Sequence, residues 1–130
     1  MKTALFSERP RTEQASKNSP CWSKDAQAQL LRVELAGEQI FLFPYAHLHV
    51  VEFARRGDSD LLKLCFARHE VRITGRQLRE LGLAFQALAV DWVRELPARY
   101  AAVAPRDTVC IAGIKVTELQ VSQPEGGQSG

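Results

Sequence analysis

Apolar and polar residues form two short neighbouring runs early in the chain, and these runs predict a pair of β-strands. Residues 30–35 and 40–43 are rich in Leu, Val, Ile and Phe, and the turn-like residues 36–38 separate them. Apolar runs on either side of a Gly-containing turn are typical of a hairpin. Pro44 interrupts the second strand, because proline lacks the N–H that a sheet ladder needs.

A longer hairpin is predicted directly after this pair. Residues 45–54 read as a strand with apolar side chains on both faces, so both faces are expected to be partly covered. Residues 55–60 have the Gly, Asp and Ser content of a tight connection. Residues 61–67 then form the partner strand, and residues 71–74 extend it or form its successor.

A helix is predicted to follow this hairpin. The sequence Thr-Gly-Arg-Gln at residues 74–77 fits a capping box, in which the threonine hydroxyl accepts a hydrogen bond from the N–H three residues later. From Leu78 onward, apolar residues recur at intervals of three and four and so share one stripe of a helix. No Gly or Asn marks an exit before Pro97, so we expect helix to about residue 95. Residues 90–96 also fit an alternating strand, and this alternative stays open.

The order of these elements predicts the fold class. Residues 108–117 are rich in β-branched side chains and form a closing strand, with Gly113 as a candidate bulge. We expect an α+β fold: a mainly antiparallel sheet of about five strands with one long helix packed on one face, followed by a final strand. One helix covers about one face of such a sheet. The other face is expected to meet a partner, unless the sheet curls into a partly open barrel capped by the helix.

Both ends of the chain differ in composition from its middle. Residues 1–26 are mostly polar and contain two prolines, which predicts a flexible N-terminal arm. Residues 120–130 are rich in Gly, Ser and Gln and predict a disordered tail. Residues 27–119 then form a single domain, in keeping with a chain of 130 residues that is 45% hydrophobic.

The charge of the chain is small and unevenly distributed. The formal net charge is +2, and residues 1–24 hold five bases against two acids, whereas the rest holds twelve bases against thirteen acids. This balance argues against a globally basic domain that binds nucleic acid over its whole surface.

Cysteine content and hydropathy bear on the compartment. The three cysteines, Cys21, Cys65 and Cys110, are odd in number and form no C-x-x-C pair, as expected for free thiols in a reducing compartment. No stretch approaches the roughly 18 apolar residues of a membrane helix, and the first residues lack the apolar region of a secretory signal. We therefore expect a cytoplasmic protein with no membrane partner.

Two histidines and a cysteine are the main candidates for chemistry in the predicted sheet. His47 and His49 share one face of the third strand, a spacing that metal sites use. Pairing Ala54 with Leu61, however, puts Cys65 on the other face, in an apolar setting that keeps a thiol inert. No nucleotide-binding, zinc-protease or nucleophile-elbow motif occurs. We expect no catalytic residue, metal or cofactor, and an enzyme or metal site at these residues is the third interpretation.

The segment from Arg55 to Arg79 is strongly basic, with seven Lys or Arg against three acids. It contains the predicted start of the helix, where free N–H groups and the helix dipole favour an anion. The candidate anion-binding residues are Arg72, Gly75, Arg76 and Arg79. Solvated arginines are the simpler interpretation, because no aromatic residues alternate with them. Binding of an anionic ligand or nucleic acid is therefore the second interpretation.

Apolar surface in excess of what one helix covers favours protein association. The leading hypothesis is a small non-enzymatic domain that self-associates, or binds another protein, through an exposed sheet face or an edge strand. The candidate contacts are Phe41, Phe43, Tyr45, Leu48 and Val50.

Overall fold

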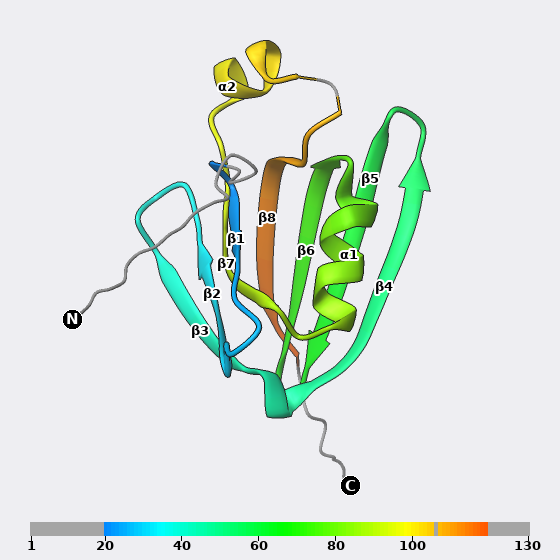
Figure 1. The fold of residues 1–130 in the computed structure, drawn as a ribbon. Helices are drawn as coiled ribbons and strands as arrows, with labels where there is room; N and C mark the ends of the chain where they lie inside the picture. The colour runs from blue at the N-terminus through cyan, green and yellow to red at the C-terminus, as the bar shows by residue number, and fades with distance from the viewer. Residues whose placement is uncertain (1–19, 106, 120–130) are drawn as a thin grey trace, which may run out of the picture.

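The structure, a computed structural model, describes residues 20–105 and 107–119. These residues form two four-stranded sheets, which we call sheet A and sheet B. The strand order in sheet A is β1 (Trp22–Lys24), β7 (Val90–Arg94), β2 (Leu30–Glu34) and β3 (Ile40–Pro44). The order in sheet B is β4 (Leu48–Arg56), β5 (Ser59–Phe66), β6 (His69–Arg76) and β8 (Cys110–Glu118). A 3-10 turn, η3 (Tyr45–His47), links the sheets, and the helices are α1 (Leu78–Gln86) and α2 (Ala98–Val103) (Figure 1).

The sheets are antiparallel apart from one pair. β7 lies between β1 and β2, antiparallel to β1 and parallel to β2. In sheet B every neighbouring pair is antiparallel. The ladder between β6 and β8 shifts register beside Gly113, so the predicted irregularity in the last strand falls next to that glycine.

The long hairpin of β4 and β5 has the predicted register from Val50 to Ala54, and a bulge before Val50 then places Leu48, in place of the expected His49, opposite Phe66. Ala54 lies opposite Leu61, and Val50 lies opposite Cys65. Pairing continues further toward the turn than expected and leaves a two-residue tip. Gly57 at this tip has a φ of 61°, a left-handed conformation that glycine adopts without strain.

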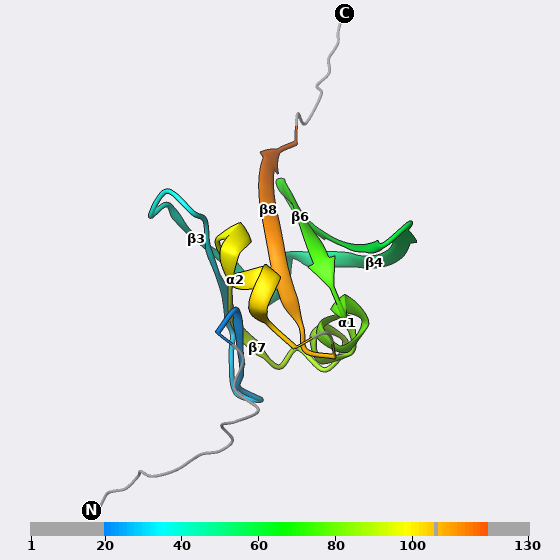
Figure 2. The same ribbon diagram turned by 90° about the horizontal axis from the view of Figure 1, so that it is seen from above.

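The hydrophobic core lies between the two sheets, and α1 fills part of the same space (Figures 1 and 2). Alternate residues of β5 and β6 point into this core, as their alternating burial shows. Phe43 of β3 stacks on Phe66 of β5 with ring centroids 4.6 Å apart, which joins sheet A to sheet B. The largest fully buried side chains are Phe85, Leu31, Leu62, Leu64, Ile73, Leu78, Leu81, Ile111, Val33, Val71, Val90 and Val93.

The α+β class and the dominance of antiparallel strands are confirmed, but the predicted single sheet of about five strands with one long helix is wrong. Eight strands form two sheets, and sheet A together with α1 covers the inner face of sheet B. The described residues do not form a closed barrel. The expectation that a single helix alone covers one face of the sheet is wrong, because residues 90–94 and 22–24 form strands of a second sheet.

The helix α1 ends well before the predicted position near residue 95 because its backbone reverses at Leu88, whose φ is 53°. The N–H of Leu88 donates to the carbonyl of Phe85 at 2.9 Å. The N–H of Ala89 donates to the carbonyl of Ala84 at 3.0 Å, and the two bonds together form a Schellman motif. Glycine usually occupies the left-handed position of this motif, so a leucine there leaves no signal in the sequence. The strand alternative for the residues that follow is the one that forms, as β7.

The predicted capping box at the start of α1 is also wrong. Thr74 lies within β6, and its hydroxyl donates to the carbonyl of Gly113 at 3.4 Å. Gln77, with a φ of 58°, turns the chain into the helix. The N–H of Leu78 then donates to the buried carboxylate of Asp60 at 3.1 Å. A residue distant in sequence caps this helix, which no local pattern could indicate.

The prediction of a flexible arm over residues 1–26 is wrong for its last part. Cys21 and Trp22 are buried, and β1 pairs with β7. Residues 1–19, like the predicted tail at residues 120–130, lie outside the described residues. Neither helix of the described chain is long and apolar enough to cross a membrane.

Candidate functional site

The free edge of β4 is the most apolar exposed part of sheet B. β4 is the first strand in the order of this sheet, and within the described part of the chain no strand pairs with its outer edge. Its large side chains Val50, Val51 and Phe53 are 51%, 36% and 38% exposed. A long unpaired edge with exposed apolar side chains favours the addition of a further strand.

The backbone of β4 alternates between bonding to β5 and facing this free edge. Arg56 and Ser59 flank a two-residue turn and so form a hydrogen-bonded pair, and such pairs recur at every second residue of the ladder. The N–H and C=O groups of Val51, Phe53 and Arg55 therefore point to the free edge. These groups are the donors and acceptors that an added strand would use.

An apolar groove runs beside this edge, between β4 and α1. Its volume is about 360 Å³, and Val51, Phe53 and Leu83 line it together with Leu62, Gly82, Gln86 and Arg79. Leu83 of the helix is 54% exposed. A Cβ at Gly82 would lie 3.3 Å from a methyl carbon of Leu62, so the glycine permits a close approach of helix and strand. The groove and the free edge together form what we call the β4 surface.

Three of the five predicted interface residues contribute little exposed surface. Phe43 and Tyr45 are buried in the core, and Leu48 packs partly against it. Phe41 is partly buried and stacks parallel to Phe43 with ring centroids 5.7 Å apart. Val50 lies on β4 and is exposed. The structure therefore brings only Val50 of this set to the β4 surface.

Burial explains why Tyr45 belongs to the fold. Its hydroxyl donates to the carbonyl of Val90 at 2.7 Å, which joins η3 to β7. Desolvation by burial raises the pKa of Tyr45 well above its usual value, and the nearby charge of Asp91 acts in the same direction, although the bond to Val90 opposes both. The phenol therefore stays protonated and keeps donating this bond.

The predicted anion-binding residues are distributed over different surfaces. Arg72 lies on the outer face of sheet B and is ion-paired with Glu70 at 2.6 Å. Arg76 lines a cavity beside the β4–β5 turn, whereas Arg79 lines the groove of the β4 surface. Gly75 is buried against the backbone of β8. The structure does not bring these four residues together around one ligand.

The start of α1 already holds an anion of the protein itself. The carboxylate of Asp60, 5% exposed, accepts the Leu78 N–H and pairs with Arg55 at 3.2 Å. This contact fills the position at the helix start where the basic segment was expected to hold an external anion.

The two histidines of the third interpretation do not share a strand face. His47 lies in η3, and a bulge between Leu48 and Val50 interrupts the strand at His49. Both imidazoles are exposed, whereas Cys65 is half-buried on β5. Across residues 20–105 and 107–119, no group of three or more His, Cys, Asp and Glu side chains could hold a metal ion.

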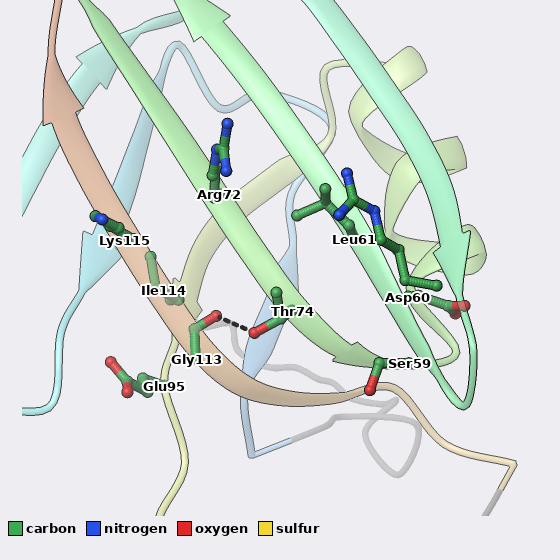
Figure 3. A pocket seen from close by; sticks show the side chains of 10 residues that line it. Ser59, Asp60, Leu61, Arg72, Thr74, Glu95, Gly113, Ile114 and Lys115 are labelled. Carbon is green, nitrogen blue, oxygen red and sulfur yellow. Dashed lines mark hydrogen bonds between the residues drawn. The ribbon is translucent and has the colours of Figure 1, made fainter.

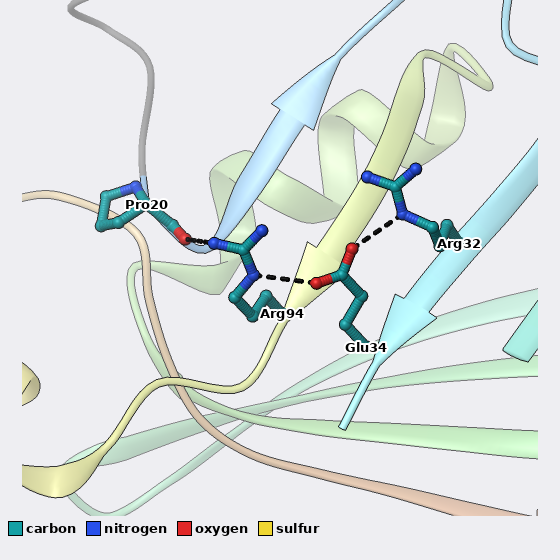
Figure 4. A network of polar contacts seen from close by, with 4 residues as sticks. All are labelled: Pro20, Arg32, Glu34 and Arg94. Atoms are coloured by element: carbon teal, nitrogen blue, oxygen red, sulfur yellow. Dashed lines mark hydrogen bonds and ion pairs between the residues drawn. The ribbon is translucent and has the colours of Figure 1, made fainter. Parts of the chain in front are cut away.

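A polar network covers the outer face of sheet A and was missed by sequence reasoning (Figure 4). Glu34 accepts hydrogen bonds from Arg94 at 3.0 Å and from Arg32 at 2.8 Å. The guanidinium of Arg94 also lies over the ring of Trp92, 4.6 Å from its centroid. The network needs β2 and β7 side by side, and that pairing has no signal in the sequence.

The same network predicts an acid-sensitive contribution to stability. Partial burial by itself raises the pKa of Glu34, but the hydrogen bonds and charges of Arg94 and Arg32 outweigh it and hold the pKa below its usual value of 4.5. A lowered pKa in the folded state stabilises the protein above the pKa of the unfolded state, and this stabilisation is lost as the pH falls through the folded value. We expect Glu34→Gln to cost about 0.5 to 1 kcal/mol near neutral pH, because the Arg32 and Arg94 side chains are 41% and 45% exposed and water screens their charges.

Urea unfolding of the wild type and Glu34→Gln at about pH 7 and about pH 3.5 measures this effect. The difference between the two proteins should shrink at the lower pH. Glu38→Gln, at an exposed glutamate of the β2–β3 turn, is the control and should show no such trend. A difference that stays constant with pH would contradict the assignment to Glu34.

Comparison of the chain with protein-family models, with curated proteins and with solved structures finds no match in any of the three.

Proposed function

We propose that this chain is a protein-interaction domain that self-associates by pairing β4 with the β4 strand of a second copy. The observation that carries the proposal is the β4 surface: a nine-residue strand with an unpaired edge beside an apolar groove. The other edges of the two sheets are less suited to strand addition. β1 and β3 have three and five residues, and β8 already accepts a hydrogen bond from the Leu96 N–H at the carbonyl of Ile111.

The free backbone groups of β4 match those of an antiparallel second copy. With a twofold axis at Phe53, the two Phe53 residues face each other, and Val51 of each copy faces Arg55 of the other. Every residue in these pairs directs its N–H and C=O to the free edge, so all three pairs are hydrogen-bonded. This register therefore joins the two copies of sheet B into one continuous sheet.

The side chains of β4 are compatible with the same register. It places two aromatic rings opposite each other at the centre, and aromatic cross-strand pairs stabilise a sheet. On the outer face, Glu52 of one copy lies diagonally across from Arg56 of the other, within reach of two long side chains of opposite charge. No like charges stand directly opposite each other, because Arg55 and Arg56 of one copy lie at the opposite end of the paired strands from those of the other copy. The two Glu52 side chains meet only diagonally, and each is paired with Lys63 of its own copy.

The apolar groove supplies the hydrophobic part of the interface. It borders the paired edge, so association brings the grooves of both copies together. The exposed portions of Val51, Phe53 and Leu83 from each copy would then leave water. Removal of apolar area from water is worth about 25 cal/mol per Å² and is the main driving force of such contacts.

The solution mass of the protein at about 10 to 100 μM, by light scattering or analytical ultracentrifugation, tests the proposal. We expect a concentration-dependent dimer for the wild type and a monomer for Phe53→Lys, because two like charges would meet at the axis. Hydrogen exchange should show protection of the Val51, Phe53 and Arg55 amides that rises with concentration in the wild type alone. This second measurement distinguishes strand pairing from association through another face.

Leu42→Lys is the matched control. Leu42 is 58% exposed and lies on β3, the edge strand of sheet A, so the change adds the same charge at a comparable site away from β4. The control should remain a dimer. The proposal is overturned if the wild type stays monomeric throughout the concentration range, or if Phe53→Lys leaves the dimer intact. In the first case, only a different protein could still pair with the β4 edge.

A further inference from the structure

Three basic residues stand side by side on the outer face of sheet B. Lys63 of β5 lies opposite Arg72 of β6, and Arg72 lies opposite Lys115 of β8. Like charges directly opposite each other destabilise a sheet. Glu52 pairs with Lys63 at 3.4 Å and Glu70 with Arg72 at 2.6 Å. Among the described residues no acidic side chain lies within ion-pair distance of Lys115, so this row keeps an excess of positive charge.

A recess lies next to this row, over β5, β6 and β8 (Figure 3). Its volume is about 380 Å³, and the basic residues that line it are Arg56, Arg72 and Lys115. The hydroxyl-bearing side chains of Ser59 and Thr74 also line it. Basic side chains from β4, β6 and β8, together with two hydroxyl groups, therefore surround the recess. The basic residues come from positions as far apart in the sequence as Arg56 and Lys115.

Gly113 keeps the floor of the recess low. It lies opposite Thr74, and a Cβ on this glycine would lie 3.1 Å from the threonine hydroxyl oxygen. Any larger residue at this position would raise the floor beside Thr74, two residues along the ladder from the pair of Arg72 and Lys115 (Figure 3). The glycine is thus part of what makes the recess accessible.

The basic side chains around the recess favour an anionic ligand with several oxygen atoms. Of the two acidic residues that line it, Asp60 is buried and bonded to Leu78 and Arg55, whereas Glu95 offsets only one of the three bases. Glu70, which pairs with Arg72, offsets a second base, so the net charge is about +1. The three oxygens of a phosphate group match the three basic side chains better than the two oxygens of a carboxylate. Arginine guanidinium groups bind phosphate oxygens through paired hydrogen bonds, and lysine adds a point charge.

The geometry points to a binding site for a phosphate-bearing ligand in this recess, held by Arg56, Arg72 and Lys115 with Ser59 as a hydroxyl donor. None of the described residues that line the recess is aromatic, so they offer no platform on which a base could stack. It therefore recognises the phosphate groups themselves, whether they belong to a free polyphosphate chain or to a nucleic-acid backbone. All of these residues belong to one copy of the chain, so the site does not require pairing of β4, although pairing would bring Glu52 of the second copy near Arg56.

Calorimetric titration with inorganic tripolyphosphate and with a short DNA duplex, at about 50 mM salt, tests this site and separates the two sources. We expect the wild type to bind at least one of the two. Arg72→Gln/Lys115→Gln should weaken that binding by about tenfold or more, the loss expected for two charge-assisted contacts. Its melting temperature should change little, because the loss of the exposed ion pair between Arg72 and Glu70 is offset by the removal of repulsion between neighbouring strands.

Lys24→Gln/Arg32→Gln is the matched control, since it changes the net charge equally but on sheet A. Binding by the control should equal that of the wild type. Binding of tripolyphosphate supports the site for a free polyphosphate, and binding of the duplex alone supports it for a nucleic-acid backbone. The proposal is overturned if neither ligand binds the wild type, or if both double variants lose affinity equally.

Discussion

Gly75→Ala is expected to lower the melting temperature by more than about 10 °C, a larger loss of stability than we expect from Asp60→Ala or Glu34→Gln. A Cβ on Gly75 would lie far inside van der Waals contact with the Cys110 carbonyl oxygen, and 3.0 Å from the carbonyl carbon. It would also lie 3.1 Å from the Cα of Ile111. These atoms are backbone of β8, so no side chain can move aside. β6 and β8 would have to separate where the ladder changes register.

Thermal unfolding followed by circular dichroism measures this loss. Gly37→Ala is the control, because a Cβ at Gly37 meets nothing within 4 Å. Alanine there should leave the melting temperature unchanged or raise it slightly by restricting the unfolded chain. Equal melting temperatures for Gly75→Ala and the wild type would mean that β6 and β8 do not approach each other this closely.

Asp60→Ala is expected to reduce the free energy of unfolding by about 2 kcal/mol, the second largest effect. The carboxylate is 5% exposed and accepts the Leu78 N–H at 3.1 Å. Without it, a buried donor at the start of α1 has no acceptor. The ion pair with Arg55 contributes less to the loss, because the Arg55 side chain is 69% exposed and its charge is screened by water.

Denaturant unfolding of Asp60→Ala and Asp60→Asn separates these contributions. Asparagine keeps an oxygen that can accept the Leu78 N–H but carries no charge, so it should retain most of the stability lost in the alanine variant. If both variants lost the same stability, the charge of Asp60, and not its bond to the helix, would be the source.

Local patterns predicted the elements whose partners are near in sequence. The β4–β5 hairpin was predicted with its register because a Gly-Asp turn and matching apolar residues act within one short segment. The start of α1 was placed close to its true position by its apolar stripe, although the expected Thr74 cap does not form. The end of α1 was missed, because Leu88 takes the left-handed position of a Schellman motif, where glycine would have been the signal in the sequence.

The candidate surfaces depended more strongly on the tertiary structure. Basic residues between Arg55 and Arg79 were visible as a band in the sequence, but strand alternation divides them between the two faces of sheet B and α1. Lys115 joins Arg72 only through the pairing of β6 with β8. Phe43 and Tyr45 were expected at an interface and instead complete the core, because sheet A supplies a second layer that the sequence pattern did not reveal.

The sequence by itself determined the α+β class, the long hairpin and the amphipathic character of α1, since each follows from residue periodicity and turn chemistry over a few positions. Only the tertiary structure decided that β1 and β7 join β2 and β3 in a second sheet, that β4 keeps a free edge, and that Asp60 caps α1. These features depend on contacts between distant segments, in which many weak pairings compete and the burial of the whole core selects among them.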